Sequence, residues 1–71
     1  MKAYDLGFKY GKVIVDGGAD KEDIIFDFGV PYVQSDFIEE MKKENIKVTS
    51  DFIEDNFKEI EEGYQAALKE P

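Results

Sequence analysis

The sequence predicts an α+β fold, in which a two- or three-stranded antiparallel sheet precedes two helices that pack on one face of it. Two observations support this fold class. Apolar side chains alternate with polar residues or glycine in the first 29 residues, which is the period of a half-buried strand. Beyond residue 35 the apolar residues recur at spacings of three and four, which is the period of a helix. A chain of 71 residues is expected to form one small domain, 1–71.

The predicted strands lie within residues 3–29. The first has apolar side chains at its even positions, Tyr4, Leu6, Phe8 and Tyr10. Gly11-Lys12 interrupts the alternation before an apolar run at 13–15, so Gly11 is either a hairpin turn or a bulge in a longer strand. After a polar loop from Asp16 to Asp23, residues 24–28 alternate again. Pro31 is expected to end this strand, since proline cannot donate to a sheet.

Two helices are predicted near 36–45 and 50–69. Ser35 is a candidate N-cap for the first, and Asn45 is suited to the left-handed conformation that ends a helix. Thr49 or Ser50 is expected to cap the second. The predicted core of sheet and helices comprises Leu6, Phe8, Val13, Val15, Ile24, Phe26, Phe28, Phe37, Met41, Ile53, Phe57, Ile60 and Tyr64.

The side-chain inventory argues against an enzyme. The chain has no histidine, cysteine or arginine, so it lacks a near-neutral base, a thiol nucleophile and a two-pronged phosphate clamp. The loop at 16–23 holds four carboxylates, but it lacks the ligand order of an EF-hand. No catalytic residue, metal site or cofactor is therefore predicted.

The charge of the chain restricts its partners. Seventeen acidic residues against nine lysines give a net charge of −8, and residues 36–71 carry eleven of those acids with five lysines. This charge opposes direct binding to nucleic acid or to an anionic membrane surface and favours basic protein surfaces. The sequence has no membrane-spanning or signal-like apolar run, so a cytoplasmic location is expected.

The second predicted helix has an acidic face. Asp51, Asp55 and Glu62 lie opposite its apolar stripe, and Glu54 and Glu59 flank them. One interpretation is an array of carboxylates that imitates DNA phosphates and occupies a basic nucleic-acid-binding surface of a partner protein. Phage-encoded inhibitors, including anti-CRISPR proteins of the DNA-mimic class, resemble this chain in size and charge. An ordinary solvated helix face is the competing interpretation.

Two alternative functions remain at this level. An assembly subunit would form a homodimer through the apolar helix seam, with Phe57, Ile60 and Tyr64 as its contacts. The predicted order of strand, helix and helix from residue 24 to 64 resembles the ribbon-helix-helix repressors, which implies a regulator. Ile25 and Asp27 stand where such a strand presents its base-reading residues, and the strand has no lysine, so DNA reading is not expected.

Overall fold

The protein is helical, and the predicted α+β fold is wrong. The computed structural model describes residues 2–18 and 20–70, and no strand or sheet occurs within these two ranges. Residue 19, which falls inside the predicted strand region, lies outside the described residues. The elements are α1 (Ala3–Asp16), the 3-10 turn η1 (Lys21–Asp23), α2 (Pro31–Lys43), α3 (Ser50–Asp55) and α4 (Phe57–Lys69).

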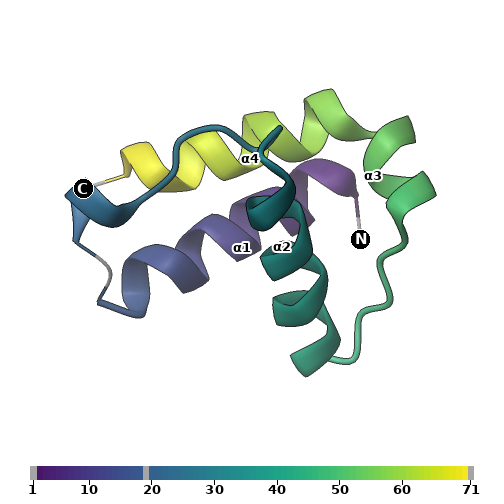
Figure 1. Ribbon diagram of the computed structural model, residues 1–71, viewed down its shortest axis with the longest axis horizontal. Helices are drawn as coiled ribbons and strands as arrows, with labels where there is room; N and C mark the ends of the chain where they lie inside the picture. Colours follow the sequence, from purple (N-terminus) through teal and green to yellow (C-terminus); the bar gives the residue numbers. More distant parts are fainter. Residues whose placement is uncertain (1, 19, 71) are drawn as a thin grey trace.

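Helices α1 and α4 lie side by side and run in the same direction, and α2 crosses them (Figure 1). Their backbones touch at Gly7, Gly11 and Gly63. A Cβ atom on Gly63 would overlap the Tyr4 carbonyl oxygen, and one on Gly11 would lie 2.5 Å from the Cβ of Ala67. Glycine is required at such a contact because any side chain would force the two helices apart.

This contact explains why the N-terminal segment is a helix and not a strand. Its buried residues are Ala3, Leu6, Gly7, Tyr10 and Gly11, which recur at helical spacings of three and four. The strand prediction treated Gly7 as a polar spacer and Gly11 as a turn or bulge. Both glycines instead lie inside α1 on its contact face, so neither alternative for Gly11 holds.

Four aromatic rings from four segments form the centre of the core. Tyr10 of α1 lies 5.3 Å from the ring of Tyr64 on α4 and 5.4 Å from Phe37 on α2. Phe28, from the segment before α2, lies 5.1 Å from Phe37 and 5.7 Å from Tyr64. None of the four is more than 2% exposed. Rings of this size bury much of the apolar area available to so short a chain.

Residues 24–28 form an extended segment along α4 and not a strand (Figure 1). Side chains take the place of a sheet partner: the Tyr64 hydroxyl donates to the Ile25 carbonyl at 2.6 Å, and the Gln65 amide donates to the Phe26 carbonyl. Phe28 is buried, but Ile25 and Phe26 are 39% and 47% exposed. The prediction of Phe26 as a core residue is therefore wrong.

The helix boundaries confirm some predicted signals and correct others. Helix α2 begins at Pro31, because proline suits the first helical position, so Ser35 lies inside the helix and is not its cap. Asn45 has the expected left-handed φ of 62°, and the Ile46 N–H donates to the Met41 carbonyl, which completes a Schellman motif. The Thr49 hydroxyl caps α3 by accepting from the Phe52 N–H at 3.1 Å.

The predicted helix 50–69 is two helices with a break at Asn56. There the backbone φ is −123°, and the Asn56 amide donates to the Phe52 carbonyl at 3.0 Å.

Seven predicted core residues are confirmed as buried: Leu6, Phe28, Phe37, Met41, Ile53, Ile60 and Tyr64. Five others are only partly buried. Val15, Ile24 and Phe57 pack against the core. Val13 and Phe8 are the other two, and the Phe8 ring stacks on Tyr4.

The glycine contact predicts whether a substitution at Gly63 raises or lowers the stability of the protein. Replacing Gly63 with alanine would stabilise an isolated helix by about 1 kcal/mol. Here we expect Gly63→Ala to destabilise the protein by about 1–3 kcal/mol in urea denaturation, because the new methyl group meets the Tyr4 carbonyl and the Phe8 N–H. Ser35→Ala, at an exposed position inside α2, is the matched control and should change stability little. A more stable Gly63→Ala protein would contradict the close contact.

Candidate functional site

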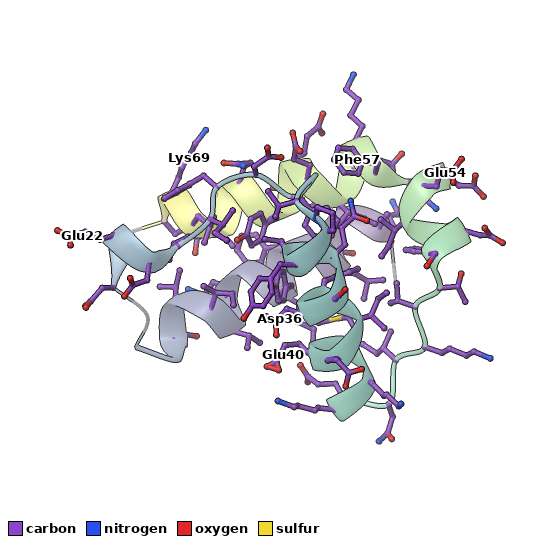
Figure 2. The ribbon with its side chains drawn as sticks, viewed as in Figure 1. Glu22, Asp36, Glu40, Glu54, Phe57 and Lys69 are labelled. Atoms are coloured by element: carbon purple, nitrogen blue, oxygen red, sulfur yellow. The ribbon has the colours of Figure 1, made fainter. Side chains whose placement is uncertain are left out.

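The predicted acidic face lies on two consecutive helices, α3 and α4. It is defined here by five exposed carboxylates, Asp51, Glu54 and Asp55 on α3 and Glu59 and Glu62 on α4. Figure 2 shows Glu54 pointing away from the body of the molecule at the outer side of α3. The structure thus leaves every carboxylate of the acidic face accessible to a partner.

The sequence around Asn56 explains how these carboxylates are held. Ile53 anchors α3 and Ile60 anchors α4, and both are almost completely buried. The break at Asn56 changes the direction of the chain between these anchors, so the angular positions of one continuous helix do not apply across it. Each helix buries its own apolar side and turns its carboxylates to solvent.

The carboxylates of the acidic face have no ion-pair partner among the described lysine side chains. The ion pairs of those residues join Lys9 to Glu44 at 3.1 Å, Lys12 to Glu70 at 3.5 Å and Lys43 to Glu40 at 3.0 Å. All of these carboxylates lie outside the acidic face. The three lysines in these ion pairs therefore neutralise carboxylates elsewhere on the surface, and the five carboxylates of the acidic face outnumber the exposed Lys58 beside them.

The acidic face is divided by the break at Asn56. Asp51, Glu54 and Asp55 belong to α3, whereas Glu59 and Glu62 belong to α4. Lys58, which is exposed on α4, lies between these two groups in the sequence and reduces the net negative charge of the surface.

The residues predicted for self-association are used inside the chain. Ile60 is 0% exposed and Tyr64 is 2% exposed, and both belong to the core between α1 and α4. Phe57 is partly buried, with its ring 5.8 Å from that of Phe28. In this structure Ile60 and Tyr64 present no surface to a second copy.

Sequence reasoning missed a second group of polar residues, on α2. The Tyr10 hydroxyl donates to an Asp36 oxygen at 2.7 Å, and Glu40 lies one turn further along, where it pairs with Lys43. Asp36 and Glu40 project from the same side of α2 (Figure 2). The i, i+4 spacing was visible in the sequence, but the tyrosine partner depends on α1 being a helix.

The Tyr10 hydroxyl is an unsuitable catalytic base. Burial, and then the hydrogen bond to Asp36, raise the pKa of Tyr10 above its ordinary value, and burial also raises the pKa of Tyr64. Both phenols therefore stay protonated at neutral pH and act as hydrogen-bond donors. Within the described residues no three carboxylates are grouped in a way that could hold a metal ion.

A groove that the sequence did not predict lies beside the end of α2. Its volume is about 480 Å³, and Ile38, Ile46 and Val48 form its apolar lining. The lysines Lys42 and Lys47 lie on it. It differs from the acidic face in both charge and position.

The chain matches no protein-family model, no curated protein and no solved structure. Among the helices within 2–18 and 20–70, none has the length and apolar character needed to cross a bilayer. What the protein does must therefore be inferred from its own surface.

The buried tyrosines predict sensitivity to alkaline pH. A raised pKa in the folded state means that the unfolded chain loses its phenolic proton first, so stability falls as the pH rises above the ordinary tyrosine value of 10.0. We expect Tyr10→Phe to cost about 1–2 kcal/mol at neutral pH, through the lost hydrogen bond, and to flatten the decline above pH 10.

Urea denaturation at a series of pH values, with tyrosinate absorbance recorded in parallel, measures both effects. Tyr32→Phe is the matched control, because Tyr32 is 72% exposed. Equal alkaline profiles for wild type and Tyr10→Phe would contradict the assignment.

Proposed function

We propose that the protein is a non-enzymatic acidic binding protein that engages a basic surface of a partner protein through its acidic face. In its most specific form it is a phage-type inhibitor of the DNA-mimic class, which includes anti-CRISPR proteins. It would occupy the nucleic-acid-binding surface of its target and make no direct contact with nucleic acid. The observation that carries this proposal is the row of exposed carboxylates on α3 and α4, free of ion pairs with the described lysines.

The mechanism is competition by charge. Lysine and arginine side chains that receive phosphates on the partner would receive the carboxylates of the acidic face. Long-range attraction between the two surfaces speeds their encounter, and the gain is reduced by salt. The interaction uses no chemical step, in keeping with a side-chain inventory without histidine, cysteine or arginine.

Rigidity supports this mechanism. Helix α4 is fixed against α1 by the backbone contacts at Gly7 and Gly63, and Thr49 caps the start of α3. A surface that is ordered before binding loses less conformational entropy when it docks. The proposal implies a cytoplasmic location, where the protein would meet such a partner.

Charge reversal on the acidic face tests the proposal. Glu54, Asp55 and Glu62 are exposed and lie outside the first turns of their helices, so the triple change to lysine should leave the fold intact. We expect this variant to lose binding to the native partner by about a hundredfold or more, because like charges then face one another. The matched control reverses Asp16, Asp20 and Glu39, which are exposed elsewhere and change the net charge equally.

The measurement is affinity capture of partners from the source cells, followed by titration of the captured partner at low and high salt. Wild type and control should bind alike, weaken by about tenfold or more as salt rises from about 50 to about 300 mM, and displace nucleic acid from the partner. If the acidic-face variant binds the same partner as tightly as wild type does, the proposal is wrong.

A further inference from the structure

The groove beside α2 has a basic rim on a protein of strongly negative charge. Lys42 is exposed in the last turn of α2, and Lys47 is exposed in the connection from α2 to α3. Neither ammonium group pairs with a carboxylate that the structure describes. Between them lies an apolar lining in which Ile38 and Ile46 are only partly buried. The groove therefore fits an occupant that combines apolar side chains with negative charge.

The chain itself carries a segment of that chemistry. Residues 20–27 contain four acidic residues and one lysine, a net charge of −3. The Ile25 and Phe26 side chains in this segment are 39% and 47% exposed, and exposed acids precede and follow them. The Tyr64 and Gln65 side chains hold the Ile25 and Phe26 carbonyls against α4, so the backbone is fixed while both apolar side chains reach solvent.

The groove and this segment cannot meet within one molecule. In Figure 1, η1 lies at one end of the molecule and the segment after it runs along α4 to the start of α2, whereas the connection after α2 leaves from the opposite end of that helix. Figure 2 shows Glu22 pointing outward at that first end. The two surfaces are different patches of one chain, so contact between copies would be heterologous, and each copy would leave one patch of each kind free.

We infer that the protein self-associates head to tail, with Ile25 and Phe26 of one copy seated in the groove of the next and their flanking carboxylates at Lys42 and Lys47. The occupant of the groove is thus a second copy of this chain. The acidic face is not part of this contact, so the association is independent of the proposed function. A row of copies would present several acidic faces to one extended partner.

The proposed contact between two copies is small, so the association is expected to be weak. Two partly exposed side chains and a single groove give an interface below the roughly 1,000 Å² of stable complexes. We therefore expect a reversible association with a dissociation constant of about 0.1–1 mM. At about 150 mM salt the Debye length is about 8 Å, which screens the net charge of −8 across a molecule 30 Å long. Contacts between an ammonium and a carboxylate persist at this salt.

Sedimentation equilibrium of the full chain from about 10 µM to about 2 mM tests the inference. The average mass of the wild type should rise continuously and pass that of a dimer at the highest concentrations. Lys42→Glu with Lys47→Glu should lower the association constant by about tenfold or more, and Ile25→Ser with Phe26→Ser should do the same. Lys58→Glu with Lys69→Glu is the matched control, because both lysines are exposed on α4 and the charge change is identical.

Mixing the two defective variants gives the sharpest result. The groove variant keeps its apolar segment and the segment variant keeps its groove, so an equimolar mixture should form a dimer and nothing larger. Circular dichroism of each variant should match the wild type. The inference is overturned if the wild type stays monomeric to about 2 mM, if both variants associate as the wild type does, or if the mixture stays monomeric.

One further measurement separates the second copy from a small ligand. Amide signals of Ile46 and Val48 in a heteronuclear NMR spectrum should shift with protein concentration. If they respond to decanoate while the wild type remains monomeric, the groove belongs to a small anionic amphiphile, and self-association is wrong.

Discussion

Close contact between the backbones of α1 and α4 is the constraint on which the rest of the structure depends. Gly7, Gly11 and Gly63 allow the two helices to touch. That approach brings the rings of Tyr10 and Tyr64 to 5.3 Å, and Phe28 and Phe37 then close the core around them. One side of α4 packs on α1 and the 24–28 segment is held to α4 by Tyr64 and Gln65, so Glu59 and Glu62 lie on the part of α4 that stays exposed. The acidic face is therefore a consequence of helix packing as much as of composition.

The sequence predicted the second half of the fold better than the first. Asn45 and Thr49 act through local hydrogen bonds, so their roles could be predicted without knowing the tertiary structure. Tyr4, Leu6, Phe8 and Tyr10 alternate as in a strand, and the two glycines of this segment carry no apolar side chain that would mark a helix face. The helical pattern becomes visible only when Gly7 and Gly11 are counted as part of the buried stripe.

The acidic face could be predicted from the sequence, whereas the burial of the apolar stripe and the groove beside α2 could not. Charged residues such as Asp51 and Glu62 are exposed in almost any fold, so the members of the acidic face could be named from the sequence. Whether an apolar stripe is buried within the chain or exposed to a partner depends on which element packs on it, and here α1 covers Ile60 and Tyr64. The groove could not be predicted, because the left-handed turn at Asn45 is what brings Ile46 and Val48 beside Ile38.

The parallel course of α1 and α4 also determines how the protein would resist mechanical force. Because the two helices run in the same direction, Ala3 and Lys69 lie at opposite ends of the pair (Figure 1). Tension applied between these ends would slide one helix along the other, and would not peel them apart one contact at a time. The interlocked glycines would then all be loaded together, so a domain held by so small a core would yield in a single step.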